Sequence, residues 1–396
     1  MSSDPIVIVG GARTPMGSFQ GDLQKVSCPD LGAIAIKGAM EKAGLAPKSV
    51  EEVIMGCVLP AGCRQVPARQ ASINADIPEA AGSTTINKAC GSGMKAVMLA
   101  NDLLRAETNS VMVAGGMESM TNAPYLLMKA RGGFRMGHGE IYDHMFFDGL
   151  QDPFKGGDNL MGVFAENTAE KYQFTREAQD NFAIESLKRA KKAGDDGTFD
   201  SEVMPVTIKT RKGETVVKLD EQPQTANLDK IPKLKPAFRK DGTVTPANSS
   251  SISDGAAAVV MMRLSEAEKQ GLKPVAKIVA HTTHSQDPAW FTTAPVAAIQ
   301  KLLEKTDWSA KDVDLYEINE AFAVVAMAAM RDLDLPHDKV NVHGGACALG
   351  HPIGASGCRI LVTLLNALQK YDLKRGVASL CIGGGEATAV AVERLH

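Results

Sequence analysis

Short β-branched runs alternate along the chain with longer stretches in which apolar residues recur at helical spacing. Residues 5–11 (PIVIVGG) form such a run and predict a buried strand, and residues 31–42 predict a helix. Residues 53–56 and 110–116 predict two more strands, and residues 93–105 predict a helix rich in Ala, Met and Leu. This β-then-α order favours an α/β sheet.

The same order of elements recurs in the second half of the chain. Residues 274–279, 313–316 and 377–381 follow the strands of the first half at a nearly constant shift. A Ser-Gly pair opens an apolar helix at Ser92 and again at Ser356. The recurrence indicates a duplicated domain, and the alternative is chance similarity between two α/β halves.

Between the two halves, residues 121–245 break this rhythm. The segment holds a Gly-rich stretch at 131–138, a helical stretch at 166–192 and a polar stretch at 209–229. Long insertions often bind substrate or join subunits, although a solvated excursion without function is the alternative. We therefore divide the chain into an N-terminal half (1–120 plus 246–272), an inserted loop domain (121–245) and a C-terminal half (273–396).

Composition and charge narrow the possible functions. Of the 396 residues, 44% are hydrophobic and 22% charged, which is typical of globular proteins and excludes wholesale disorder. The formal net charge of -3 provides no broad positive field, so we expect neither a nucleic acid nor a membrane partner. The N-terminus shows no leader pattern and no window holds 18 uninterrupted apolar residues, so we expect a cytoplasmic protein.

The cysteines are scattered along the chain and form no CxxC pair. Their spacing favours neither a disulfide framework nor a zinc knuckle, and no cluster of His, Asp and Glu has metal-ligand spacing. We therefore expect no metal site and mostly reduced, buried thiols. The seven positions are Cys28, Cys57, Cys63, Cys90, Cys347, Cys358 and Cys381.

One thiol, Cys90, stands where a reactive cysteine is favoured. It lies in residues 87–95 (NKACGSGMK), between an expected strand end and the helix that begins near Gly93. A helix N-terminus stabilises a thiolate, and Gly91 and Gly93 let the backbone approach a substrate carbonyl closely. The alternative is an inert cysteine buried at a tight turn.

Two histidines occur in residues 341–357 (NVHGGACALGHPIGASG), where five glycines and a proline precede an apolar helix. Pro352 fixes the chain directly after His351, so this imidazole is favoured as a rigidly held base. His343 is better interpreted as a loop histidine whose hydrogen bonds are satisfied.

Two further loops add candidate chemistry. Cys381 opens CIGGGE after a buried strand, although a plain turn is the alternative, and the absence of GKS/T and GxGxxG disfavours a phosphate cradle. Asn319 opens NEAF between a strand and a helix, where it can orient a water near an oxyanion or simply cap the helix. Two Cys-plus-Gly loops and one His-Pro loop suggest acyl transfer.

Together these loops resemble the thiolase family over essentially the whole chain. Four motifs occur in order: NKACGSGMKAV around Cys90, NEAF at Asn319, GGACALGHPIGASG around His351 and CIGGG at Cys381. The resemblance implies an α/β fold of two βαβαβαββ halves, packed as a five-layer α-β-α-β-α sandwich with an inserted loop domain.

The resemblance also implies a mechanism. Cys90 would be the acyl-accepting nucleophile, His351 the base that activates it, and Cys381 the acid/base toward the substrate α-carbon. A water held by Asn319 together with His351 would stabilise one oxyanion, and the backbone amides of Cys90 and Gly383 the other. Such an enzyme cleaves acetoacetyl-CoA with CoA to two acetyl-CoA, or runs the reverse Claisen condensation. CoA is then a substrate, and no cofactor is implied.

The resemblance places CoA along the inserted segment, with Ser250 as the favoured contact. A locally basic stretch either attracts the CoA phosphates or is only a solvated face. It comprises Lys230, Lys233, Lys235, Arg239 and Lys240. The positions that resemble family pocket residues are Met161, Phe238, Ser250, Phe291 and Phe322.

Three residues depart from the pattern of many short-chain thiolases: Leu160, Pro246 and Glu386. Because Phe291 falls at a position that restricts long acyl chains, we expect a short-chain enzyme, with a broad-chain 3-ketoacyl-CoA thiolase of β-oxidation as the alternative. A non-enzymatic acyl-CoA-binding scaffold is disfavoured because all four reactive positions are present. Residues 123–139 resemble a loop that ties thiolase tetramers together, so we expect a homotetramer built as a dimer of dimers.

Overall fold

The N-terminal half of the chain builds one side of a mixed sheet. The computed structural model, which describes residues 4–154, 159–211 and 213–396, gives its strands in the spatial order four, three, five, twelve, one. The third strand runs parallel to both the fourth and the fifth, and the other neighbouring strands in this order are antiparallel. These strands are β1 (Ile6–Arg13), β3 (Glu52–Gly56), β4 (Gly82–Ile86), β5 (Val111–Ser119) and β12 (Ser253–Arg263), with the short β2 (Gly17–Ser18) paired to β12.

The C-terminal half repeats this strand order, except that one strand is shortened to a single bridge. Its strands are β13 (Ala276–Ser285), β14 (Leu315–Ile318), β15 (Arg375–Ile382) and β16 (Glu386–Arg394). They lie in the order β14-β15-β16-β13, which matches β3-β5-β12-β1 of the first half. The counterpart of β4 is only an isolated parallel bridge between Tyr316 and Val340. Short antiparallel pairing of β1 with β13, at Val7 and Ile8, joins the two halves into one sheet. The matching orders support the predicted duplication.

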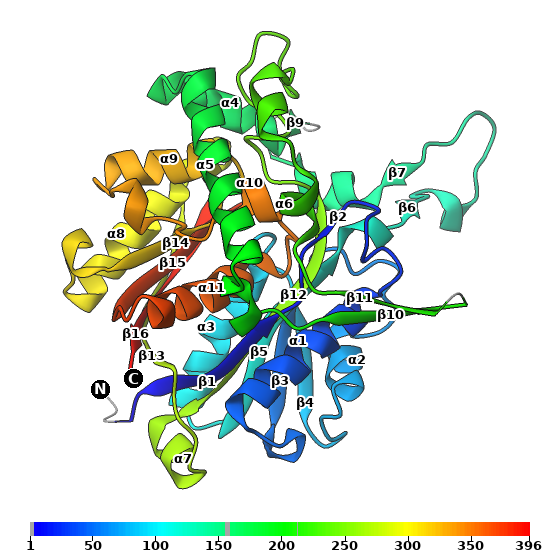
Figure 1. Cartoon of the computed structure of the whole chain (residues 1–396). Helices are drawn as coiled ribbons and strands as arrows, with labels where there is room; N and C mark the ends of the chain where they lie inside the picture. The colour runs from blue at the N-terminus through cyan, green and yellow to red at the C-terminus, as the bar shows by residue number, and fades with distance from the viewer. Residues whose placement is uncertain (1–3, 155–158, 212) are drawn as a thin grey trace.

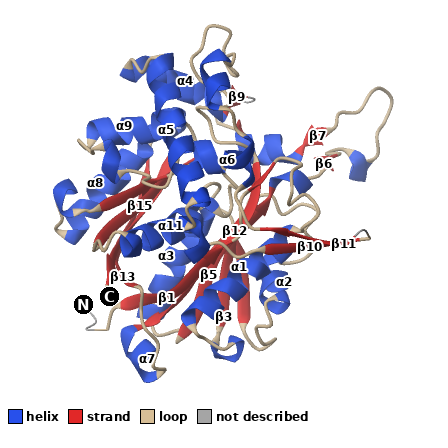
Figure 2. Ribbon diagram, viewed as in Figure 1, coloured by secondary structure: helices blue, strands red, loops and turns tan. Residues whose placement is uncertain are grey.

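Helices cover both outer faces and fill the space between the two halves (Figures 1 and 2). Three separate apolar clusters hold these layers together. One lies under the outer helices of the N-terminal half, one surrounds the two central helices, and one lies under the outer helices of the C-terminal half. The α/β fold with its α-β-α-β-α layers, predicted from the sequence, is therefore confirmed. The outer helices are α1 (Cys28–Ala43), α2 (Pro67–Asn74), α8 (Ala294–Thr306) and α9 (Ala323–Asp332); the central ones are α3 (Ser92–Arg105) and α11 (Ser356–Lys370).

Local sequence explains where these helices begin and end. Ser27 caps α1 by accepting the backbone N–H of Asp30, and Gly44 ends it in the left-handed conformation with φ of 66°. By contrast, α11 is buried on nearly all sides because it lies between the two halves of the sheet, and its Leu, Ile and Val side chains pack with strands of both halves. The central helices thus need apolar residues around most of their circumference.

The segment between β5 and β12 lies outside the main sheet. It contains the helices α4 (Met161–Tyr172), α5 (Arg176–Asp195) and α6 (Glu221–Thr225), and three hairpins, two of which project from the body in Figure 1. The hairpins pair β6 (Tyr125–Leu126) with β7 (Tyr142–Asp143), β8 (Gln151–Asp152) with β9 (Asn159–Leu160), and β10 (Val206–Thr210) with β11 (Gly213–Val217). The short helices α7 (Leu264–Lys269) and α10 (Ala346–Leu349) lie elsewhere in the chain. The proposed domain boundaries stay a prediction.

One element prediction needs correction. The helical stretch expected at residues 166–192 is two helices, because Gln173 adopts a left-handed backbone with φ of 54° and ends α4. Thr175 then caps α5 through the N–H of Ala178. Apolar periodicity continues through this break, so the pattern alone did not reveal it. Across the described residues, no helix is long and apolar enough to cross a membrane.

Candidate active site

Cys90 stands at a tight turn directly before α3, as predicted. The turn needs Ala89 in a left-handed conformation with φ of 44°. Ser92 fixes it, because its hydroxyl donates to the carbonyl of Ala89 at 2.7 Å and accepts the N–H of Lys88 at 2.8 Å. The reactive thiol is thereby presented by a locally rigid loop.

Cys90 is mainly a thiol rather than a thiolate in the free protein. Burial raises the pKa of its thiol to about 11, against the lowering effect of the N–H groups of Gly383 and of Cys90 itself; the charge of Glu118 adds to the rise. The expectation that the helix N-terminus favours a thiolate at Cys90 stays a prediction, because loss of hydration on burial dominates the pKa of the free protein. A neighbouring base is needed to remove the proton.

His351 has the arrangement of such a base. Its Nδ1 lies 2.5 Å from the hydroxyl oxygen of Ser356, and that hydroxyl donates its only hydrogen to the carbonyl of Pro352 at 3.0 Å. The hydroxyl oxygen must therefore accept from Nδ1–H, which leaves Nε2 unprotonated. Nε2 is buried and has no hydrogen-bond partner among the described residues. Burial, assisted by the charge of Arg359, lowers the pKa of His351 to about 3, so the ring is a neutral base.

The loops of Cys90 and His351 converge because the two central helices meet at their N-termini. A Cβ on Gly357 would lie 2.4 Å from the backbone nitrogen of Met94, and one on Gly93 would lie 3.0 Å from that of Cys358. Only glycine at both positions lets the helices approach this closely. Each helix then presents the loop that precedes it to the same region.

The second thiol belongs to the same region. Cys381 is fully buried near the end of β15, where burial, reinforced by Cys90, raises its pKa above the ordinary value. Two residues later, the backbone N–H of Gly383 interacts with the Cys90 thiol. The structure thus brings Cys90, Cys381 and Gly383 together, as the sequence predicted.

Asn319 follows β14 and has a free side chain. Its backbone N–H donates to Ser379 at 3.0 Å, whereas neither its Oδ1 nor its Nδ2 has a partner among the described residues, although the residue is 1% exposed. Leaving both atoms unpaired in the interior is costly unless a water or ligand binds them. The helix-cap alternative is wrong, because α9 begins after Phe322 and has no side-chain cap.

His343 has a different environment. Its Nε2 lies 3.3 Å from the Tyr371 hydroxyl, and its ring packs edge-on against Phe199. Burial first, then the charge of Lys370, lowers its pKa to about 4. These contacts fit the interpretation of His343 as a structural loop histidine.

The predicted pocket residues gather around Cys381. Met161, Phe238, Phe291 and Phe322 pack in one apolar cluster with this thiol. The rings of Phe238 and Phe322 meet edge to face at a centroid distance of 6.1 Å, which fixes their orientation. The cluster gives an acyl chain an apolar surface beside the buried sulfur.

Ser250 bridges two of the reactive loops. Its N–H donates to the carbonyl of Ala321 at 2.9 Å, and the carbonyl of the next residue, Ser251, accepts the N–H of His351 at 3.2 Å. The extended segment around Ser250 therefore links the Asn319 loop to the His351 loop. The CoA contact expected of Ser250 stays a prediction.

The basic stretch is not uniform. Lys230, Lys233, Lys235 and Lys240 are exposed, whereas Arg239 donates to the carbonyl of Val163 at 3.4 Å and to the side chain of Asn167. Arg239 is therefore held against α4. The four lysines remain free of resolved ion pairs among the described residues.

Sequence reasoning missed two supporting residues, Ser356 and Glu118. Glu118, at the end of β5, accepts the N–H of Val58 and Gly354, both at 2.9 Å, and that of Leu59 at 3.2 Å. Burial raises the pKa of Glu118 to about 7, although these backbone donors oppose the rise. Both residues lie in segments that resemble the thiolase family, residues 115–119 (GGMES) and residues 344–357, but neither was given a supporting role.

Comparison with known proteins agrees with this geometry. The family model for the thiolase N-terminal domain matches residues 6–265, and that for the thiolase C-terminal domain matches residues 272–394. An acetyl-CoA acetyltransferase from Cupriavidus necator is 51% identical over 98% of this chain and 99% of that protein. A cytosolic acetyl-CoA acetyltransferase from Mus musculus is 49% identical over 99% of both chains.

Solved structures give the same result for the fold. The crystal structure of the acetyl-CoA acetyltransferase from Bacillus anthracis matches with a TM-score of 0.96 and 42% identity, over 99% of each chain. The match therefore extends over both halves and the segment between them. With two family models that together span nearly the whole chain and relatives near 50% identity, this protein belongs to the thiolase family.

Proposed function

We propose that this thiolase reversibly cleaves acetoacetyl-CoA with CoA to two acetyl-CoA through an acyl-Cys90 intermediate, and catalyses the reverse Claisen condensation. The observation that carries the proposal is the pairing of a buried neutral His351, with Nε2 free, and two thiols at converging loops. Full-length relatives named acetyl-CoA acetyltransferase support the choice of reaction.

The first half-reaction begins when His351 Nε2 takes the Cys90 proton. The thiolate attacks the 3-keto carbon of acetoacetyl-CoA, and its oxyanion is stabilised by a water on Asn319 and by the protonated His351. The C2–C3 bond then breaks, leaving an acetyl group on Cys90. The departing acetyl-CoA enolate takes a proton from Cys381, while the N–H groups of Cys90 and Gly383 stabilise the charge on its thioester oxygen.

The second half-reaction releases the acetyl group to CoA. A CoA thiolate attacks the acyl-Cys90 carbonyl, and the tetrahedral oxyanion is held by preorganised donors. The Cys381 thiolate takes the proton from the thiol of CoA, and on collapse the C–S bond to Cys90 breaks and the leaving Cys90 thiolate takes back its proton from His351. Each preorganised donor typically contributes about 3 kcal/mol to the transition state.

The CoA pocket is part of the same proposal. Ser250 is the proposed polar contact, and the apolar cluster of Met161, Phe238 and Phe322 lies beside it. The exposed Lys233 and Lys235 are proposed to attract the CoA phosphates. Replacing both lysines by Ala should raise the KM for CoA and leave kcat unchanged; an unaltered KM would contradict the phosphate role.

Chain length is proposed to be short because Phe291 fills the acyl end of the pocket. It is buried and packs edge-on against Phe164 at 6.1 Å between ring centroids. A broad-chain 3-ketoacyl-CoA thiolase remains the second candidate, because Leu160, Pro246 and Glu386 depart from the pattern of many short-chain thiolases. A ladder of 3-ketoacyl-CoA substrates distinguishes the two by the chain length at which kcat/KM peaks.

We also infer a homotetramer, a dimer of dimers, working in the cytoplasm. The hairpin that joins β6 to β7 projects from the body and exposes large apolar side chains, which are rarely left in water without a partner (Figure 1). They include Tyr125, Leu127, Met128, Phe134, Met136 and Ile141. A sedimentation mass of one or two protomers would contradict the tetramer. The name of the mouse relative supports the compartment.

The decisive assay is the CoA-dependent loss of acetoacetyl-CoA enolate absorbance. The enzyme should be active, Cys90→Ala should abolish turnover, and acetyl-CoA should label Cys90 covalently. Binding of CoA esters without labelling would instead support the non-enzymatic scaffold. Absence of turnover on acetoacetyl-CoA, with turnover on longer substrates, would move the protein to the broad-chain class.

A further inference from the structure

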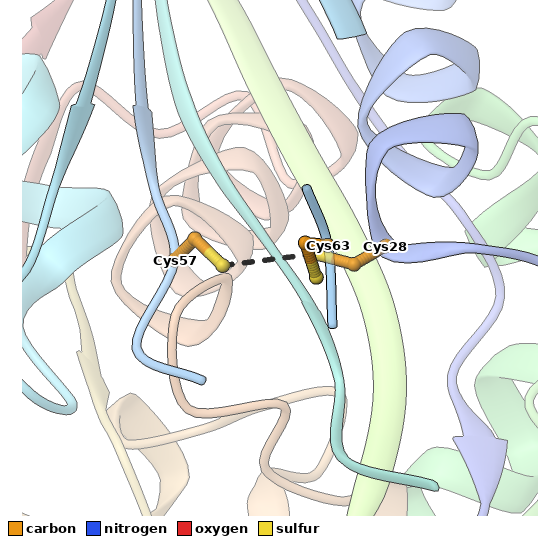
Figure 3. Close-up of side chains that lie close together, drawn as sticks. All are labelled: Cys28, Cys57 and Cys63. Atoms are coloured by element: carbon orange, nitrogen blue, oxygen red, sulfur yellow. Dashed lines mark hydrogen bonds between the residues drawn. The ribbon is translucent and has the colours of Figure 1, made fainter. Parts of the chain in front are cut away.

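Three cysteines from a helix, a strand end and a loop come together beside the His351 loop. Cys28 is the first residue of α1, Cys57 directly follows β3, and Cys63 belongs to the loop before α2. Figure 3 shows their side chains pointing toward one another. The sulfurs of Cys28 and Cys57 are 3.8 Å apart, and all three sulfurs lie within 4.8 Å of one another.

We propose that these three thiols form a binding site for one divalent thiophilic cation of the Zn²⁺ type. Metal–sulfur bonds of about 2.3 Å require sulfurs about 3.8 to 4.0 Å apart around a single tetrahedral or trigonal ion. The observed spacing needs only small side-chain adjustment to reach that value. A disulfide, by contrast, requires sulfurs about 2.05 Å apart and leaves the third thiol unused.

The surroundings suit a cation bound as thiolates. Cys28 and Cys57 are buried, while Cys63 is partly exposed, so an ion can enter from the side of Cys63. A cavity of about 350 Å³ opens there, lined by Cys28 and Cys63 together with Lys25 and Arg64. Three thiolates with a divalent ion carry one net negative charge, and the neighbouring Glu118 adds a second when it is ionised; the two cationic side chains at the cavity offset both. Soft sulfur donors select thiophilic ions over Mg²⁺ or Ca²⁺.

The site is separate from the reacting thiols. Cys57 Sγ lies 3.7 Å from Glu118 Oε1, and Glu118 holds Gly354 of the His351 loop through its other oxygen. A bound cation would therefore lie beside the His351 loop, which contacts the backbone of Cys57 at Gly354, without occupying the loop. Neither Cys90 nor Cys381 belongs to the group of three.

The test is a titration of the purified full-length protein with Cd²⁺, which reports thiolate binding through its ultraviolet sulfur-to-metal charge-transfer band. We expect one Cd²⁺ per chain, displaced by Zn²⁺, and a rise in Tm on binding. Cys63→Ala should weaken binding at least about tenfold and abolish the rise in Tm. Cys90→Ala and Cys358→Ala serve as matched controls and should bind as the unmodified protein does, because neither thiol belongs to the group of three and the buried Cys358 packs in the central apolar cluster.

Three results would overturn the proposal. Cd²⁺ binding unchanged by Cys63→Ala would show that other thiols hold the ion, and binding lost in Cys90→Ala would assign it to the active site. A disulfide between two of the three cysteines in protein purified without reductant, seen by peptide mass, would show that the cluster stores a covalent bond instead. Because Cys63 is partly exposed, its replacement by Ala or Ser should leave the fold intact, and circular dichroism checks this.

Discussion

Removing the hydroxyl of Ser356 should slow the reaction without destroying the site. Ser356 sets the tautomer of His351, because its single hydrogen goes to Pro352 and its oxygen accepts from Nδ1 at 2.5 Å. In Ser356→Ala, Nδ1–H loses its partner in a buried position, and the proton is free to move to Nε2, the nitrogen that must accept from Cys90. Both changes act on the same proton transfer.

The magnitude follows from the cost of an unpaired buried group. Loss of one partner costs about 1–3 kcal/mol, which corresponds to a fall in kcat/KM of about 5- to 150-fold if it is expressed in the transition state. The assay is the loss of enolate absorbance at low acetoacetyl-CoA. The rate at which iodoacetamide alkylates Cys90 gives an independent measure of thiol activation and should fall in parallel.

A matched control separates positioning from stability. Thr363, on the same helix α11, is fully buried and donates to Glu202 Oε1 at 3.0 Å. Thr363→Val removes a buried hydroxyl far from His351, so it should lower the free energy of unfolding by a similar amount and leave kcat/KM of the folded enzyme unchanged. If Ser356→Ala kept kcat/KM within twofold, or if both variants slowed the reaction equally, the tautomer argument would be refuted.

Three further predictions concern other parts of the site. Burial lowers the pKa of His351 to about 3, whereas the unfolded ring titrates near 6.5, so protonation favours the unfolded chain. This residue should therefore reduce the free energy of unfolding by about 1.4 kcal/mol per pH unit as pH falls from about 6 toward 3. The urea midpoint of His351→Gln should depend less on pH over that window than the midpoint of the unmodified protein. Lys88 and Glu386 form an ion pair between the Cys90 loop and the Cys381 loop and so can align the two loops. A double-mutant cycle with Met at each position should give a coupling of about 1 kcal/mol in kcat/KM, and zero coupling would show that the pair does not align them. Phe291→Leu should raise the kcat/KM for a six-carbon 3-ketoacyl-CoA relative to acetoacetyl-CoA by at least about tenfold, and an unchanged ratio would show that another residue limits chain length.

Much of the fold could be predicted because it depends on local pattern. The runs at residues 5–11 and 110–116 coincide with β1 and β5 except for the first residue of each run, and the Ser-Gly pairs at Ser92 and Ser356 begin α3 and α11. Strand and helix periods are properties of a few consecutive residues, so they can be read without knowing the partners. The break at Gln173 was missed because a single left-handed residue leaves apolar periodicity almost intact.

The candidate site was partly predictable for a related reason. Cys90, His351 and Cys381 each lie in a loop whose glycines and proline mark it within the sequence. The roles of Ser356 and Glu118 were not visible, because a hydroxyl or carboxylate gains its function from the groups that it contacts. The composition of a loop shows where reactive side chains lie, whereas the contacts that orient those side chains depend on packing.

The sequence by itself determined the α/β rhythm, the duplication and the position of each reactive loop, since these follow from residue types over short spans. Only the tertiary structure decided the ionisation of Cys90, because burial raises the pKa of its thiol. It also decided the proton position on His351, because the Ser356 hydroxyl donates to the Pro352 carbonyl and must accept from Nδ1–H. It alone brought Cys28, Cys57 and Cys63 together. Spacing along the chain gave no sign of that cluster, because the contact is made where a strand end, a helix start and a loop pack against one another, and distance in space depends on that packing.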